Sequence, residues 1–270
     1  KKSYLYLLHA TFLKSDIMKK IALLFCLAIL LSCSNDDSSQ PHDTTADVLL
    51  KKTITQSNGT SYETLYKYDG KKLLEARSVR ENKKFDYNGN NISKISWYTN
   101  PDTDNTLTQT VEFEYLPNGK LKKFVQESDN PLTVEFTYVG QDTVNFVARA
   151  YRSSYDFVGY FTMKDDEISE YVYLNGGRPR PSVRYTYDNK NHPLKNVTGY
   201  NKLSLYHYFY NSVHFNGFTT NVGSSKNCIS NSLIQDPSVV EVMNTYEYNE
   251  NGFPKAINKD SNSAADYLFY

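Results

Sequence analysis

The sequence reads Val111-Glu112-Phe113-Glu114-Tyr115 and, after two further residues, Asn118-Gly119. Alternate residues of a β-strand point to opposite faces, so Val111, Phe113 and Tyr115 would share one face. The two glutamates between them would point to the other face and into water. Asn-Gly supplies the positive φ angles of a tight turn. The stretch therefore predicts the first arm and the turn of a β-hairpin.

This hairpin pattern recurs along the chain. Clear copies cover 65–70, 85–89, 111–119 and 246–252, and weaker copies cover 136–140, 161–166 and 185–189. The strands end near anchor positions that lie 19 to 28 residues apart, at 68, 87, 115, 138, 163 and 187. This period fits one hairpin per unit. Because one hairpin is too small to be stable alone, neighbouring units must pair edge to edge.

Each turn is followed by two apolar residues three positions apart. These pairs are Leu73/Ala76, Ile92/Ile95, Leu121/Phe124, Val144/Val147, Ile168/Tyr171, Leu194/Val197 and Phe253/Ala256. In a regular strand the two members would point to opposite faces. Either a β-bulge turns one member back, or the first member fills the turn while the second joins the sheet. We expect an all-β fold, an antiparallel meander of repeated hairpins forming one large twisted sheet, half-barrel or closed barrel.

Three of the copies carry a family resemblance. The stretches 68–74 (Tyr-Asp-Gly-Lys-Lys-Leu-Leu), 87–92 and 248–255 resemble the YD repeats of Rhs-type shell proteins. They are even more similar to the degenerate YD-like repeats of Bacteroidota outer-membrane lipoproteins. The resemblance covers roughly residues 62–200 and 244–270. It implies an architecture only, since such repeats carry no chemistry of their own.

The N-terminal region predicts export. Lys19 and Lys20 precede an apolar run over 21–31, which is too short to cross a bilayer but typical of a signal peptide. The box Leu30-Leu31-Ser32-Cys33 resembles the signal of bacterial lipoproteins, whose cysteine is lipidated and becomes the mature N-terminus. The resemblance implies lipidation at Cys33. We expect the chain to divide into upstream translation (1–17), a signal peptide (18–32), a flexible polar tether (33–47) and a single β-repeat domain (48–270).

Short motifs in the tether bear on location. Ser34-Asn35-Asp36-Asp37 is similar to the surface-export signal of Bacteroidota lipoproteins, with Asn35 where an acidic residue is typical. We expect a lipid-anchored protein of the outer membrane at the cell surface, with retention on the periplasmic leaflet as the alternative. Asp43-Thr44-Thr45 resembles the Bacteroidota O-glycosylation motif, which implies Thr44 as an acceptor.

Charge and cysteine content exclude several function classes. Removal of residues 1–32 takes away five of 30 basic and one of 30 acidic residues, which leaves 25 against 29 and a net charge of −4. Nucleic-acid binding needs clustered positive charge, so we expect no nucleic-acid partner. Cys228 would be the one thiol left beside a lipidated Cys33, so no intrachain disulfide is expected. We expect Cys228 to be a small buried side chain.

Residues 199–243 depart from the repeat. They predict either an irregular insertion or two units with eroded motifs. Within them, 206–210 and 239–243 read as strands, and the Asn-, Ser- and Gly-rich stretch 221–225 reads as a loop. Long loops often carry function, so this region is a candidate for it.

Few side chains are arranged for chemistry. We expect His192 to be solvated in a turn, and His207 and His214 to lie on opposite faces of a strand, so no metal site is expected. Asp165-Asp166-Glu167 lacks the spaced ligands of a calcium loop and is expected to be a solvated hairpin turn. No catalytic motif is found, so we expect neither an enzyme nor a cofactor. The alternative is a glycan-active hydrolase whose carboxylate pair is assembled by the fold.

One aromatic pair stands apart from the repeat. Trp97 and Tyr98 lead into the polar loop 99–105 and are the candidate ligand contacts, since such rings stack on sugars and line peptide grooves. We expect the other aromatic residues to be mainly in the core. The predicted function is a lipid-anchored β-repeat protein that binds a glycan, a peptide or an envelope-protein partner. A purely structural envelope protein is a further alternative.

Overall fold

The computed structural model describes residues 48–57, 59–151, 153, 156–175, 178–179, 182–213, 223–258 and 263–270. The predicted signal peptide and tether lie outside the described residues, and so do Cys33, Thr44 and His214. In the described part of the chain, no helix combines the length and the apolar character needed to cross a membrane.

Strands dominate the described residues, as the alternating repeats predict. They are β1 (Leu50–Ser57), β2 (Thr60–Asp69), β3 (Lys72–Ser78), β4 (Glu81–Asn88), β5 (Asn91–Thr99), β6 (Thr106–Tyr115), β7 (Leu121–Glu127), β8 (Leu132–Val139), β9 (Thr143–Ala150), β10 (Phe157–Lys164), β11 (Glu167–Asn175), β12 (Arg178–Pro179), β13 (Val183–Tyr187), β14 (Cys228–Leu233), β15 (Val240–Met243), β16 (Tyr246–Tyr248), β17 (Pro254–Ile257) and β18 (Ser263–Phe269). The helical elements are the 3-10 helix η1 (Tyr200–Leu203) and the α-helix α2 (Ser204–Val213).

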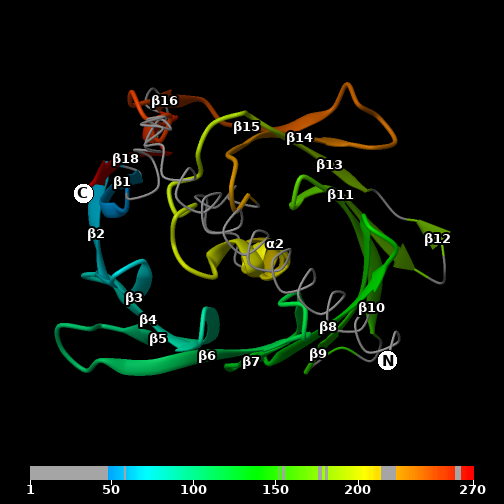
Figure 1. Ribbon diagram of the computed structural model, residues 1–270, viewed down its shortest axis with the longest axis horizontal. Coiled ribbons are helices and arrows are strands. Elements are labelled where there is room, and N and C mark those ends of the chain that lie inside the picture. The colour runs from blue at the N-terminus through cyan, green and yellow to red at the C-terminus, as the bar shows by residue number, and fades with distance from the viewer. Residues whose placement is uncertain are drawn as a thin grey trace, which may run out of the picture. The chain divides into compact units, whose positions relative to one another are not determined.

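The strands form one antiparallel meander (Figure 1). From β1 to β11 each strand pairs with the next one along the chain, and β1 also pairs with β18. The order continues from β11 through β13 and β14 to β15, with the short β12 beside β11. At the other end β16 pairs with β17, and within the described residues no ladder joins β15 to β16. The all-β meander is confirmed, and the sheet is not closed into a barrel.

A β-bulge follows the turn in most units. In the β2–β3 hairpin Tyr68 pairs with Leu73 and Lys67 with Glu75, so Leu74 is the extra residue. Four further hairpins shift in the same way, with Ser93, Lys122, Ser169 and Lys255 as the extra residues. In the first four of these hairpins both members of the apolar pair then lie on the core face, so the bulge alternative is confirmed for four pairs. In β16–β17 the residues opposite Tyr248 and Tyr246 are Pro254 and Ile257, so the predicted pair Phe253/Ala256 is displaced by one position.

Two further predicted pairs do not follow this rule. β8 and β9 pair without a register shift, and Val144, Phe146 and Ala148 are buried by simple alternation. The three-residue loop 140–142 takes up the extra residue there, so the strand needs no bulge. The pair Leu194/Val197 lies outside any strand. For these two pairs the prediction is wrong.

The recurring anchor tyrosines join neighbouring units. The Tyr115 hydroxyl donates to the Ile92 carbonyl oxygen at 2.7 Å. Equivalent bonds to backbone carbonyls run from Tyr68 to Leu50, from Tyr138 to Leu121 and from Tyr187 to Ile168. Buried tyrosine hydroxyls and buried carbonyls both need partners, and each bond satisfies one of each. This pairing gives a physical reason for a tyrosine at the anchor position.

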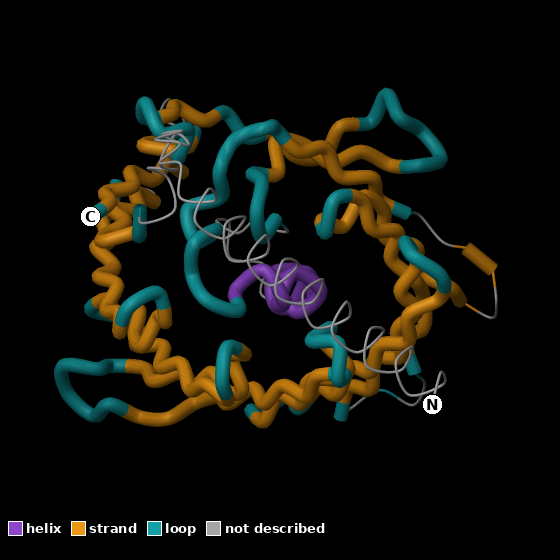
Figure 2. Tube along the Cα trace, in the orientation of Figure 1, coloured by secondary structure: helices purple, strands orange, loops and turns teal. Residues whose placement is uncertain are grey.

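The inner face of the sheet, defined here as the face that carries the buried apolar residues, packs against α2. Figure 2 shows the strands curving around this helix. The Tyr206 ring lies 5.0 Å from the ring of Phe113, and the Phe209 ring lies 5.2 Å from that of Phe146. The predicted strand at 206–210 is wrong. Aromatic residues at nearly every position fit either period, and enclosure by the sheet favours a helix buried on most sides.

The outer face carries charged pairs instead. Salt bridges between neighbouring strands are Lys52–Glu63, Lys94–Glu112, Lys122–Glu114, Arg149–Glu135, Arg184–Glu170 and Lys255–Glu247. Strand residues therefore alternate between an apolar inner face and a charged outer face, as the 111–115 stretch predicts.

A segment that we call the strap, residues 188–203, crosses one end of the sheet. Its Thr198 N–H donates to the Lys71 carbonyl oxygen at 2.9 Å, and the Asn196 side chain donates to that of Val48 at 2.9 Å. The strap also contacts the β16–β17 turn, where the Asn191 N–H donates to the Gly252 carbonyl oxygen at 2.9 Å. Alternate turns of an antiparallel meander lie at the same end of the sheet. We call this end, with its strap, the turn rim.

Candidate functional site

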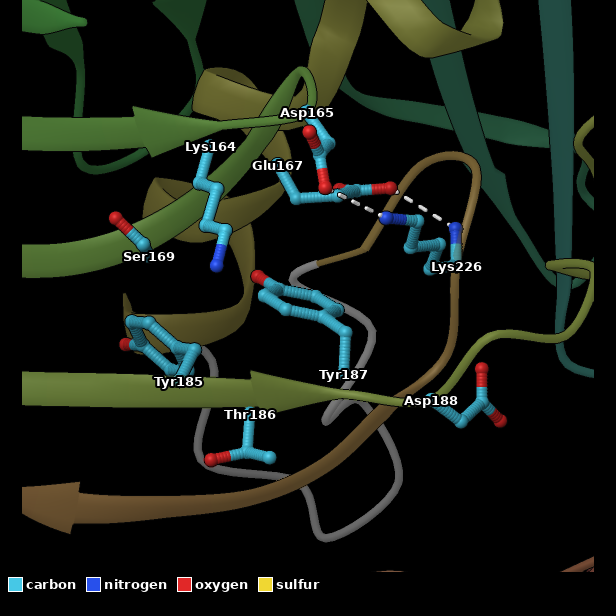
Figure 3. A pocket seen from close by; sticks show the side chains of 9 residues that line it. All are labelled: Lys164, Asp165, Glu167, Ser169, Tyr185, Thr186, Tyr187, Asp188 and Lys226. Carbon is cyan, nitrogen blue, oxygen red and sulfur yellow. Dashed lines mark hydrogen bonds and ion pairs between the residues drawn. The ribbon is translucent and has the colours of Figure 1, made fainter.

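A cavity of about 240 Å³ opens at the turn rim. The β10–β11 turn, the end of β13 and the loop 223–227 form its walls (Figure 3). Its lining residues are Lys164, Asp165, Glu167, Ser169, Tyr185, Thr186, Tyr187, Asp188 and Lys226. The site therefore combines charged groups of both signs with tyrosine rings.

Glu167 is the buried carboxylate of this site, with 2% of the residue exposed. Its oxygens accept the backbone N–H groups of Ser224 at 3.0 Å, Ser225 at 2.6 Å and Lys226 at 2.9 Å. Burial raises the pKa of Glu167, and the three N–H donors oppose that rise. Consecutive N–H groups that converge on an anion form a nest, which Glu167 fills here. Its carboxylate thereby fixes the loop 223–227 to the start of β11.

The expectation of a solvated acidic turn is correct for two residues and wrong for the third. Asp165 and Asp166 are exposed and adopt φ of +53° and +63° at the centre of the β10–β11 turn. The hydrogen bond from Lys226 at 3.0 Å lowers the pKa of Asp165. Glu167 is buried because the loop that covers it arrives from 57 residues later in the chain. Local sequence does not carry that information.

Asp188, a further carboxylate of the cavity beside Asp165 and Glu167, is also engaged. It accepts the backbone N–H of Asn227 at 3.2 Å and that of Lys190 at 3.0 Å, and it accepts the Tyr248 hydroxyl. The neighbouring Tyr187 hydroxyl donates to the Ile168 carbonyl oxygen, and burial raises the pKa of Tyr187. The carboxylates of Glu167 and Asp188 thus serve to hold the loops of the turn rim together.

This arrangement suits contact with a small polar group better than catalysis. Ligand pockets usually measure roughly 300–1,000 Å³, so this cavity is small. Lys164 and Tyr185 line it and offer an ammonium group and a ring (Figure 3). A general base needs a free oxygen within reach of substrate, whereas the oxygens of Glu167 already accept several donors. Within the described residues, no three His, Cys, Asp or Glu side chains gather to hold a metal.

The structure separates the two predicted ligand contacts. Trp97 is 7% exposed and belongs to the core cluster. Tyr98 follows it on β5 and carries the Lys84 ammonium 5.0 Å above its ring. The two side chains do not form one aromatic surface, and neither lines the cavity. Ligand binding at this pair stays a prediction. Of the two side chains, Tyr98 is the one that a ligand could reach from solvent.

Two histidines are buried, contrary to the sequence analysis. His192 is 1% exposed, where a solvated residue is expected, and His207 is 8% exposed on α2, where a strand is expected. Their rings pack on Tyr200, with centroid distances of 5.6 Å and 4.5 Å. Burial lowers the pKa of each histidine to about 3. The strap carries His192 and α2 carries His207, and a pattern of turn residues at 188–193 does not reveal the burial of either.

Cys228 is a free, buried thiol, as the sequence predicts. Burial raises its pKa to about 12, so the reactive thiolate is disfavoured.

Comparison with known proteins gives a likeness in fold. No family model and no curated protein matches the sequence. The crystal structure of a porin-like protein from Bacteroides vulgatus superposes with a TM-score of 0.52 at 14% identity, over 83% of this chain and 99% of that one. A porin-like protein from Bacteroides uniformis superposes with a TM-score of 0.35 at 8% identity, over 82% and 96%. At 14% identity the first likeness concerns the fold alone.

Proposed function

We propose that this chain is a non-catalytic, lipid-anchored protein of the outer membrane whose β-sheet domain presents a binding surface to a partner. The partner classes are a glycan, a peptide or another envelope protein. The fold-level likeness to a protein described as porin-like from Bacteroides supports an envelope setting.

The two-faced sheet is the observation that carries this proposal. Strands that span a membrane place apolar side chains outward, toward lipid. Here the outward side chains form ion pairs such as Lys94–Glu112 at 3.0 Å, so we infer that the sheet stands in water. The inner face is filled by α2 and its aromatic neighbours, so a conducting channel is not part of the proposal. Attachment to the membrane then depends on the predicted lipid at Cys33.

A binding role fits the candidate site better than the hydrolase alternative. Glu167 and Asp188 accept hydrogen bonds that fix loops, and Asp165 pairs with Lys226, so each of the three carboxylates that line the cavity is already engaged. The anchor tyrosines and the bulge residues of the repeat hold the strands of the sheet together.

Metabolic labelling with an alkyne fatty acid in a Bacteroidota host tests the anchor. The wild-type chain should take up label, and Cys33→Ala should abolish it. Cys228→Ala is the matched control, because that thiol is buried and should not be acylated. Loss of label in the Cys228 variant alone, or labelling of the Cys33 variant, would contradict the proposal.

Partner capture tests the binding role. The acylated protein, cross-linked on intact cells and screened on glycan arrays, should retain at least one glycan, peptide or envelope protein. Tyr98→Ala tests whether this half-buried ring takes part. Hydrolysis of an arrayed glycan by the purified protein would replace the proposed role with the hydrolase.

A further inference from the structure

The turn rim carries more lysine than acid. Its segments are 48–51, 69–72, 88–91, 116–120, 140–143, 164–167, 188–203, 223–227 and 249–253. They hold nine lysines (51, 71, 72, 120, 164, 190, 195, 202 and 226) and seven acids (69, 142, 165, 166, 167, 188 and 250), a net of 9 − 7 = +2. The segments that connect the opposite strand ends are 78–81, 99–106, 127–132, 150–157, 175–183, 233–240 and 258–263. The described residues of these segments include two basic and seven acidic ones, a net of 2 − 7 = −5. The two ends of the sheet therefore differ in charge.

Several rim lysines lie over tyrosine rings. The ammonium group lies 5.4 Å from the ring centroid in Lys72–Tyr87, 4.8 Å in Lys120–Tyr138, 5.2 Å in Lys51–Tyr270 and 6.0 Å in Lys190–Tyr248. Tyrosine and lysine are both amphipathic, with an apolar body and a polar end. Such pairs suit a boundary between protein and lipid headgroups.

The chain enters the described domain at this same rim. The Asn196 side chain donates to the Val48 carbonyl oxygen, and the Tyr270 N–H donates to that of Leu49 at 2.9 Å. Cys33 precedes Val48 by 15 residues. The predicted tether, treated as a flexible coil of that length, would have a root-mean-square span of about 20 Å. A lipid at Cys33 would therefore hold the turn rim close to the membrane at high effective concentration.

We propose that the turn rim, including the cavity that opens there, docks on the anionic phosphate headgroups of the membrane. This inference rests on the proposed anchor at Cys33. Lysines near a negatively charged surface are attracted to it within a Debye length, and a short tether keeps them there.

Site-specific fluorescence tests the orientation. Gln141 and Asn130 are exposed residues beyond opposite ends of β8, so Gln141→Cys and Asn130→Cys place one dye at each end of the sheet. The buried Cys228 should not react. The acylated, labelled proteins are inserted into phosphatidylglycerol vesicles that contain a headgroup spin-labelled lipid. Quenching at position 141 should exceed quenching at position 130 by about three-fold or more, and 0.5 M salt (about a 4 Å Debye length) should reduce the difference.

Charge-matched variants complete the test. The triple substitution Lys72→Gln, Lys120→Gln and Lys190→Gln at the rim should remove most of the difference in quenching between positions 141 and 130. The triple substitution Lys94→Gln, Lys122→Gln and Lys255→Gln on the outer face changes the charge equally and should leave it intact. Equal quenching at both ends, or a difference that survives the rim substitutions, would overturn the docking proposal. Failure of acylation at Cys33 would instead overturn the proposed function.

Discussion

At the scale of single residues, Glu167 shows how a buried charge can hold a loop. Its carboxylate accepts three consecutive N–H groups, a set of partners that a neutral amide cannot satisfy equally well. Glu167→Gln turns an amide NH₂ toward N–H donors. We expect the free energy of unfolding to fall by about 1–3 kcal/mol. Urea denaturation at pH 7, followed by circular dichroism, measures this change.

The neighbouring Asp166 provides the control. It is exposed at φ +63°, a conformation that asparagine tolerates, so Asp166→Asn should change the free energy of unfolding by less than about 0.5 kcal/mol. Equal losses in both variants would show that the contact with loop 223–227 does not stabilise the fold.

The anchor tyrosines give a second prediction at this scale. Tyr115→Phe removes the bond to the Ile92 carbonyl oxygen, so we expect a loss of about 1 kcal/mol in the free energy of unfolding. Tyr160→Phe is the control, since the Tyr160 hydroxyl makes no hydrogen bond to a described residue. If the two substitutions cost the same, the inter-unit bond is not what stabilises the repeat.

At the scale of elements, the strap and the β4–β5 turn meet at a glycine. A Cβ atom on Gly199 would lie 2.6 Å from the Asn90 carbonyl oxygen, whereas a Cβ on Gly70 would meet nothing within 4 Å. Both residues have positive φ, so alanine is strained at either position. We expect Gly199→Ala to cost about 1–3 kcal/mol more than Gly70→Ala in unfolding free energy, because overpacking adds to the shared strain. Thermal and urea unfolding of the two variants compare them directly.

The sequence predicts well those elements whose contacts lie between residues close together in the chain. The β6–β7 hairpin and its bulge follow from Val111, Phe113 and Asn118-Gly119, because alternation and turn chemistry are local. The α2 helix does not follow, because its identity depends on the sheet that surrounds Tyr206 and Phe209. A run of aromatic residues has no clear period of its own.

At the scale of the whole molecule, the missing information is long-range. The pairing of β1 with β18 joins residues more than 200 positions apart, and the Asn196–Val48 bond spans 148. The cavity likewise depends on loop 223–227 reaching Glu167 across 57 positions. The periodicity of a sequence reports local structure and not such long-range contacts. It therefore predicted the sheet but neither the strap nor the candidate site.

The strap and α2 each place one neutral histidine inside the molecule, which makes the stability of the fold depend on pH. His192 and His207 have a folded-state pKa of about 3, whereas an unfolded histidine titrates near 6.5. Below about pH 6.5 the unfolded chain therefore binds more protons than the folded one, and stability falls as pH falls. The two groups together contribute a slope of at most about 2.7 kcal/mol per pH unit well below that point.

A double variant isolates this contribution. His192→Asn keeps an acceptor for the Leu194 N–H, and His207→Phe keeps a ring against Tyr200. All other titrating groups are shared with the wild type. Urea unfolding at pH 7.5, 6.5, 5.5 and 5.0 should show the wild type losing stability relative to the variant, by up to about 4 kcal/mol between pH 7.5 and 5.0. Parallel stability curves would mean that the histidines are protonated, or reach water, in the folded protein.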